Sequence, residues 1–278
     1  MRNIEAREIH EAVVGLVTQA ARHLPPDVNQ ALAAALAREE SDSAREILGQ
    51  LLENAELAAR TGLPLCQDTG VGVFFVELGA DVRVQGVLPE IINAAMVEGY
   101  AKGLLRKSLC HPLTRKNTGD NSPAAIHVDI VPGDRLTIMH MAKGGGSENM
   151  SRCTMLTPAQ GWAGIKDFVV RRMAEAGPNP CPPTIVGVGI GGTFDMAPAL
   201  AKKALFRPVG IRNPDPEIAA MELELLDAVN DLGIGPMGLG GRTTSLDVKI
   251  EMRPCHIASL PLAVNVQCHS SRVREVVL

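Results

Sequence analysis

The stretch LPLCQDTGVGVFFVEL, residues 63–78, marks the point at which the character of the chain changes. It joins a turn that carries Cys66 and Asp68 to a run rich in valine and phenylalanine, residues 71–78. Runs of β-branched and aromatic residues that begin or end at glycine, proline or aspartate are typical of strands. The chain before Gly62 has the spacing of helices instead, so this stretch predicts where the sheet structure begins.

The residues before this stretch have apolar side chains at helical intervals. In residues 3–23 these side chains recur every three or four positions, and Pro25 ends the pattern. Ser43 and Glu46 form a candidate capping box ahead of a second periodic run. We therefore predict a small helical lobe over residues 1–60.

The residues after it alternate between the two kinds of pattern. Four short β-branched runs predict strands: VGVFFVEL, AAIHVDIVP, DRLTIMHM and TIVGVGI. Four segments with helical spacing lie among and after them: 89–105, 158–176, 194–206 and 217–232. The sequence therefore predicts an α+β (mixed α/β) fold, with a mixed sheet body and packed helices over residues 61–278 as one continuous domain.

Composition and charge limit the possible partners. The 278 residues are 46% hydrophobic, as a packed core requires, and the net charge of −4 comes from dispersed acidic and basic residues. Binding to nucleic acid or a membrane surface calls for clustered positive charge, so a small-molecule partner is favoured. The first residues carry frequent charges, and no run approaches the ~20 apolar residues of a membrane span. We expect a cytoplasmic protein whose thiols stay reduced.

Three of the six cysteines lie on turns beside strand-like runs: Cys66, Cys181 and Cys268. Thiolates on turns suit an iron-sulfur cluster or zinc, and their wide spacing excludes a local finger or ferredoxin motif. A free cysteine that only packs in the core is the alternative for each of them. That alternative is the stronger one for Cys110 and Cys153, while Cys255, which precedes His256, fits either interpretation.

Two glycine motifs invite a functional interpretation. The flexible loop predicted for MAKGGGSENMS, residues 141–151, could bind a carboxylate or phosphate through its backbone N–H groups, although a polar surface loop is the alternative. GVGIGG, residues 187–192, fits G-x-G-x-x-G, which would indicate an NAD-binding oxidoreductase. A proline-rich turn follows where that fold needs a strand that ends in an acidic residue. We therefore interpret these glycines as close packing of a strand on a helix.

Taken together, the blocks resemble the alpha subunit of two-subunit class I fumarate hydratases over roughly residues 60–270. The resemblance rests on PLCQDTG, KNTGDN, KGGGSENMS, NPCPPTIVGVGIGGTF, GIGPMGLGG and PCHIASLPLAVNVQCH. The alpha subunit of L-tartrate dehydratase shares the CQDTG and CPP blocks. KGGGSENMS and GIGGTF are similar to the fumarase version.

This resemblance implies a hydro-lyase that interconverts fumarate and L-malate. It also implies a 4Fe-4S cluster held by Cys66, Cys181 and Cys268, with one iron that has no protein ligand. An open coordination position suits a Lewis acid that binds the substrate hydroxyl and a carboxylate oxygen.

The resemblance also implies roles for five further residues. Asp68 would exchange a proton at the substrate hydroxyl, and His256 would orient it or couple to it. Arg106, Gln67 and Gly145 would contact the substrate, with the guanidinium suited to a dicarboxylate. From the residues alone, a core histidine and a solvated charge at a helix end are the alternatives for His256 and Arg106.

A complete site also needs a base for the carbon proton and more positive charge. The resemblance implies that a separate beta subunit supplies both, in a heterotetramer of two alpha and two beta chains. The alternatives that stay open are an L-tartrate or related hydroxy-dicarboxylate dehydratase, an NAD-binding oxidoreductase and a non-catalytic metal-binding subunit.

Overall fold

The computed structural model describes residues 1–278, which form an α+β fold as predicted. The chain divides into two compact units, each assembled from separate segments. Unit 1 comprises Met1–Pro25, Asn54–Gly145 and Arg272–Leu278, and unit 2 comprises Pro26–Glu53 and Gly146–Ser271. No helix is long and apolar enough to cross a membrane.

This division differs from the predicted helical lobe over 1–60 and body over 61–278. Helix α1 (Ala6–Arg22) belongs to unit 1, because the buried stripe that includes Ile9, Val13 and Val17 is part of the core of that unit. Helix α2 (Pro26–Arg38) and the first part of α3 (Asp42–Thr61) belong to unit 2. Most of the first sixty residues are helical as predicted, except that Arg2–Ile4 form a strand, and the helices are shared between two cores.

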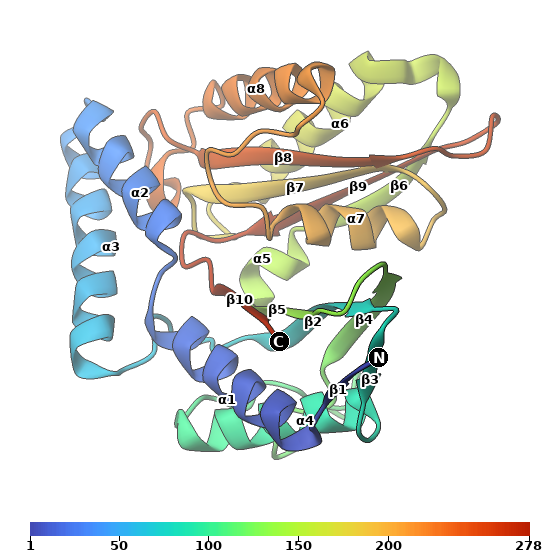
Figure 1. The fold of residues 1–278 in the computed structure, drawn as a ribbon. Coiled ribbons are helices and arrows are strands. Elements are labelled where there is room, and N and C mark those ends of the chain that lie inside the picture. Colours follow the sequence, from blue (N-terminus) through green and yellow to red (C-terminus); the bar gives the residue numbers. More distant parts are fainter. The chain divides into compact units, whose positions relative to one another are not determined.

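Unit 1 contains a four-stranded sheet in the order β10-β5-β2-β4. Its strands are β2 (Val71–Gly79), β4 (Ala125–Val131), β5 (Leu136–Lys143) and β10 (Val273–Val277). Strand β2 runs parallel to β4 and antiparallel to β5, which pairs antiparallel with β10. Helices α1 and α4 (Leu88–Lys102) cover one face of the sheet (Figure 1) and enclose a core that includes Phe74, Ile92 and Ile138. Strands β1 (Arg2–Ile4) and β3 (Val82–Val84) form a separate parallel pair.

Unit 2 is a second four-stranded sheet, in the order β6-β9-β7-β8, with helices on both faces (Figure 1). Its strands are β6 (Arg152–Leu156), β7 (Thr184–Gly191), β8 (Ser245–Arg253) and β9 (Leu260–Gln267). Helices α6 (Gly161–Ala176) and α8 (Pro216–Asn230) pack on one face, and α7 (Met196–Ala204) packs on the other. The short helices are α5 (Gly145–Asn149), η1 (Pro158–Gln160) and η2 (Pro236–Gly238).

The two glycine motifs take different forms in the structure. A Cβ at Gly187 or Gly189 would clash with the backbone of α7, so the interpretation as close strand-helix packing is confirmed for these two glycines. A Cβ at Gly191 would instead clash with the backbone of Arg253 on β8. The prediction of a flexible loop over 141–151 is wrong. Strand β5 continues to Lys143 and α5 begins at Gly145, so Gly144 is the single residue between the two elements.

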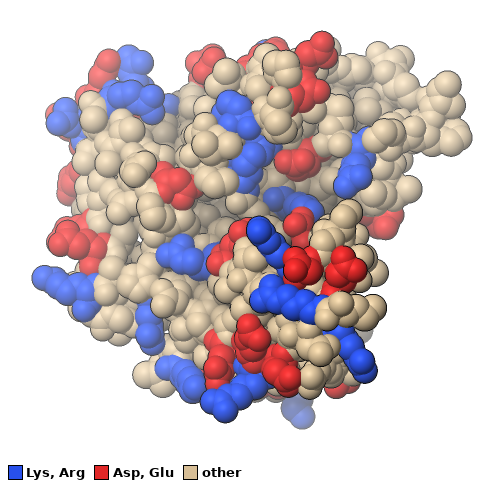
Figure 2. Space-filling model, in the orientation of Figure 1, with Lys and Arg blue, Asp and Glu red and all other residues tan.

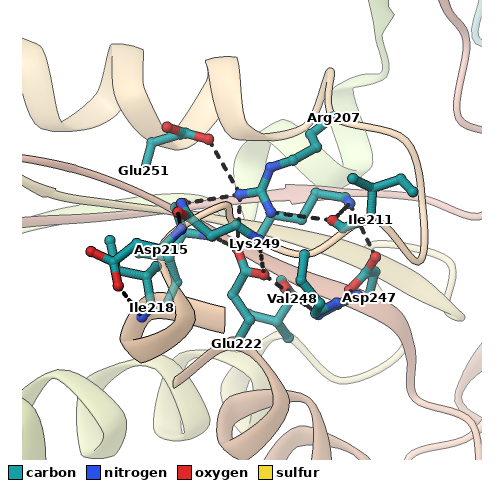
Figure 3. Close-up of polar contacts among 12 residues, drawn as sticks. Arg207, Ile211, Asp215, Ile218, Glu222, Asp247, Val248, Lys249 and Glu251 are labelled. Atoms are coloured by element: carbon teal, nitrogen blue, oxygen red, sulfur yellow. Dashed lines mark hydrogen bonds and ion pairs between the residues drawn. The ribbon is translucent and has the colours of Figure 1, made fainter. Parts of the chain in front are cut away.

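A cluster of buried charges lies along the outer edge of β8 (Figure 3). Arg207 Nη2 lies 2.7 Å from Glu222 Oε1, and Lys249 Nζ lies 3.1 Å from Asp247 Oδ2. Glu222, Asp247 and Lys249 have fully buried side chains. Burial lowers the pKa of Lys249, while the adjacent Asp247 carboxylate acts in the opposite direction. Each buried charge therefore has an opposite charge beside it, as burial requires.

Replacing Glu222 by glutamine is expected to lower the free energy of unfolding by about 3 kcal/mol or more. The fully buried Glu222 carboxylate pairs with both Arg207 and Arg212, and Arg207 would keep only its longer pair with the partly exposed Glu251. Urea denaturation of the two chains measures this difference. Glu224→Gln is the matched control. Glu224 lies two residues further along α8, is solvent-exposed and pairs only with groups at the surface. An equally small loss for both variants would show that the buried cluster contributes little to stability.

Acidic and basic residues are interspersed over the face shown in Figure 2. On this face no extended region carries only positive charge. This distribution agrees with the dispersed charges of the sequence and gives no support to a nucleic-acid surface on this side.

Candidate active site

The turn that carries Cys66 and Asp68 is held from beneath by buried hydrogen-bond donors of unit 1. Tyr100 Oη donates to the carbonyl oxygens of Thr69 (3.0 Å) and Gly70 (2.8 Å). Asn121 Nδ2 also donates to the Gly70 oxygen (3.2 Å). Both side chains are buried, and burial raises the pKa of Tyr100, so its hydroxyl keeps its proton. The turn is therefore fixed to α4 and to the KNTGDN segment.

The Asp68 carboxylate lies at the start of α5, where two backbone groups orient it. The Gly145 N–H donates to Oδ2 (2.7 Å), and the Gly70 N–H donates to Oδ1 (3.1 Å). A Cβ at Gly144 would lie 3.4 Å from Oδ2, so glycine lets the backbone approach the carboxylate. The structure thus brings the predicted residues Asp68 and Gly145 together.

Arg272 is a buried cation behind this turn that the sequence analysis missed. Its side chain is 2% exposed, and Nη1 donates to the carbonyl oxygen of Asp68. Nearby His140 is fully buried on β5, with its ring centroid 4.6 Å from that of Phe74. Burial lowers the pKa of His140 to about 3, and the charge of Arg272 acts in the same direction. The histidine is therefore neutral, and Arg272 provides the positive charge behind Asp68.

The other two predicted substrate residues of unit 1 are exposed. Gln67 Oε1 accepts a hydrogen bond from Cys66 Sγ (3.3 Å), so the side chains of these neighbours contact each other. The backbone oxygen of Arg106 accepts from Thr69 Oγ1 (2.7 Å), which joins Arg106 to the same turn. The Arg106 guanidinium is exposed and forms no ion pair within the chain, so it is available to an anionic ligand.

In unit 2 the structure brings the turns of Cys181 and Cys268 to the same end of the sheet. Strands β7 and β9 are antiparallel with Ile185 opposite Gln267, so the residues before β7 lie beside those after β9. The Cys181 carbonyl oxygen accepts from His269 Nδ1 (2.9 Å) and from the His269 N–H (3.4 Å). Two of the three predicted cluster ligands are therefore presented together.

His256 lies at the opposite end of this sheet. It sits in the exposed connection between β8 and β9, and β8 runs parallel to β7 with Arg253 opposite Gly191. Strand β7 has eight residues, a length of about 26 Å at the usual rise. The structure therefore does not bring His256 to Cys181 and Cys268, because the whole of β9 separates it from Cys268. The alternative of a core histidine is also wrong, since the side chain is exposed.

The remaining cysteines lie in other local settings. Cys110 forms an isolated bridge with Asn117, Cys153 lies on β6, where burial raises its pKa, and Cys255 is exposed beside His256. None of the six cysteines forms a disulfide. No three histidine, cysteine or acidic side chains gather so as to hold a metal ion, and the shared cluster of Cys66, Cys181 and Cys268 stays a prediction.

Helix α5 is also held by polar side-chain contacts within unit 2. Glu148, in the GGGSEN block, pairs with Lys202 (2.5 Å) and accepts from Asn265 Nδ2 (3.1 Å). The signals for the missed residues were present but weak. Asn121 ends KNTGDN, Tyr100 is the single tyrosine of the chain, and Arg272 follows the Cys268 turn. The sequence alone does not reveal that these three residues contact the turn of Cys66 and Asp68.

Comparisons with known proteins extend over nearly the whole chain. Residues 10–277 match the family described as fumarate hydratase (Fumerase). A Methanocaldococcus jannaschii protein named "Putative L(+)-tartrate dehydratase subunit alpha" is 45% identical over 272 residues, which is 95% of each chain. The L(+)-tartrate dehydratase alpha subunits of Escherichia coli strains UTI89 and K12 are 34% and 33% identical over 269 residues, covering 95% of this chain and 89% of theirs.

Proposed function

We propose that this chain, which belongs to the fumarate hydratase (Fumerase) family, is the alpha subunit of a hydro-lyase acting on a four-carbon dicarboxylate. The observation that carries the proposal is the family match over residues 10–277, within which the CQDTG turn is held rigidly with its carboxylate oriented. The proposed reaction is the reversible hydration of fumarate to L-malate. L(+)-tartrate is the second candidate substrate, and the names of the similar relatives favour it.

Cys66, Cys181 and Cys268 are the residues that would hold a 4Fe-4S cluster. The donor chemistry fits, because all three are partly exposed thiols outside any disulfide, and two of them are presented at the same end of one sheet. When bound, the cluster supplies a Lewis acid at an iron without a protein ligand. Free thiols also suit the reducing cytoplasm, where we place the enzyme.

Asp68 is the residue that we assign to proton exchange at the substrate oxygen. Each carboxylate oxygen accepts one backbone N–H, so both keep capacity for a further hydrogen bond. Because these bonds fix its rotamer, the carboxylate is already oriented before the substrate binds. General acid-base catalysis requires a proton acceptor positioned in this way. Arg106 and Gln67 bind the substrate carboxylates, with the exposed guanidinium giving the first positive charge.

The beta subunit completes this site in our proposal. Asp68 is the carboxylate among the predicted substrate residues, and it serves the hydroxyl oxygen, so the carbon proton needs a separate base. A dianionic substrate also needs more cationic donors than Arg106. The words "subunit alpha" in the names of the relatives support a partner chain, and we propose an assembly of two alpha and two beta chains.

The alpha chain alone is expected to form malate from fumarate at least about a hundredfold more slowly than with its partner, since positioned acid-base groups contribute 10²–10⁴ in rate. Anaerobic reconstitution of the alpha chain with and without the beta subunit measures this, and the beta subunit alone is the control. Equal rates without the partner would place the carbon base in this chain. Parallel assays on fumarate, L-malate and L(+)-tartrate identify the substrate. A larger kcat/KM for tartrate than for fumarate and L-malate would overturn the proposal that fumarate is the substrate.

A further inference from the structure

The edge strands of the two sheets differ in whether side chains bond to their outward-facing backbone groups. Along the edge of β8, Arg212 donates to the carbonyl oxygen of Val248 (3.3 Å) and Arg207 donates to that of Ile250 (3.0 Å). Glu222 accepts from the Ile250 N–H (2.8 Å). The charge cluster of Figure 3 thus occupies backbone groups that could otherwise pair with another strand.

Strand β4 forms an edge of the unit 1 sheet without such protection. All seven residues pair with β2 in unbroken register, and the sequence AIHVDIV contains no lysine, proline or glycine. Val128 is 43% exposed and Ile130 is 76% exposed. No side chain bonds to the backbone of Ile126, Val128 or Ile130. A long, regular edge of this kind, with apolar residues at every second position, is a template for another strand.

We propose that β4 pairs antiparallel with β4 of a second copy of this chain, around a two-fold axis at Val128. In this register Val128 lies opposite its own copy, and Ile126 lies opposite Ile130 of the second copy. His127 lies opposite Asp129 of the second copy, so an imidazole and a carboxylate face each other twice. Apolar and opposite-charge cross-strand pairs of this kind stabilise a sheet.

The sequence of β4 selects this axis over its neighbours. Residues that face each other across an antiparallel two-fold lie on the same side of the sheet, so the axis must pass through a residue. An axis at His127 would place that histidine opposite its own copy. An axis at Asp129 would place two carboxylates opposite each other, which is unfavourable. Only the axis at Val128 pairs all seven residues.

The same register continues the core of unit 1 across the axis. On β2, Phe74 and Val76 lie opposite Ile126 and Val128, and both are fully buried in that core. Ile126, Val128 and Ile130 share this side of the sheet because alternate residues face the same way. Pairing would therefore cover the exposed Val128 and Ile130 with apolar side chains of the second copy. This contact joins two alpha chains, and it does not depend on the substrate proposed above.

Introduced thiols test the axis directly in the full-length chain. With Val128→Cys the two thiols lie on residues whose Cα atoms are about 4.5–5.5 Å apart, within the range of a disulfide. We expect mild oxidation to yield a covalent dimer on non-reducing electrophoresis, with peptide mass spectrometry locating the bond at position 128. The native chain, which has six cysteines of its own, is the background control.

Ile130→Cys is the matched control, because position 130 and its copy are about 14 Å apart along the ladder. We expect at least about tenfold less cross-linking than with Val128→Cys, given the short reach of a disulfide. An equal mixture of Ile126→Cys and Ile130→Cys chains should instead cross-link. Val128→Lys should abolish the dimer in sedimentation while the circular dichroism stays unchanged. Failure of Val128→Cys to link, equal linking by Ile130→Cys, or a dimer that survives Val128→Lys would each overturn the proposal.

Discussion

The Cys181→Ser chain is expected to retain no intact cluster after anaerobic reconstitution, and with its partner it should form no measurable malate. Serine offers a harder oxygen donor that stays protonated, whereas iron-sulfur clusters are held by thiolates. Iron and sulfide content, together with absorption in the iron-sulfur charge-transfer region, measure the loss independently of activity.

Cys110→Ser is the control for this substitution, because Cys110 lies in a loop beside Asn117 and is not among the proposed ligands. It should keep the iron content of the native chain. If Cys181→Ser bound as much iron and sulfide as the native chain, Cys181 would not be a ligand, and the three-cysteine site would have to be abandoned.

The second large effect is expected for Asp68→Asn, which should keep the cluster absorption and lower kcat by about 10²–10⁴ in the assembled enzyme. The amide has nearly the same shape, and its oxygen can still accept from one of the two backbone N–H groups that orient the carboxylate. It cannot take up a proton. Steady-state rates with fumarate and L-malate, measured beside the absorption spectrum, separate loss of chemistry from loss of the cluster.

Asp134→Asn serves as the matched control, since Asp134 is an exposed aspartate of the same unit outside the site. Its rates should equal those of the native chain. Full turnover by the Asp68→Asn enzyme would remove Asp68 from the mechanism, even if the cluster and its ligands were as proposed.

The sequence predicted individual elements well and their partners poorly. The β-branched run of β2 and the periodic stripe of α1 are local signals, and both elements lie where they were expected. A buried stripe does not specify which sheet it covers, so the division into two interleaved units could not be read from it. The same limit applied to α5, whose glycines predict flexibility when their hydrogen-bond partners are unknown.

In the candidate site, too, features set by adjacent residues could be predicted, whereas contacts between residues far apart in the sequence could not. The turn of Cys66 and Asp68 was predicted from adjacent residues, and the structure places it as a turn. Its supports, Tyr100 and Arg272, reach it from far along the chain. His256 shows the reverse relation between sequence and space. It is close to Cys268 in sequence, yet the antiparallel ladder of β9 carries the two residues to opposite ends of a sheet.

The interleaving of the two units also fixes an order of events during synthesis. Strand β10 and Arg272 leave the ribosome only after residues 146–271, which form most of unit 2. Until then β5 lacks its antiparallel neighbour, and the Asp68 carbonyl lacks the guanidinium that holds it. Unit 1 therefore cannot complete its sheet until residues 272–278 have been synthesised, although its other segments are made earlier. If the proposed cluster binds at the Cys66 turn, its insertion accordingly follows translation of β10.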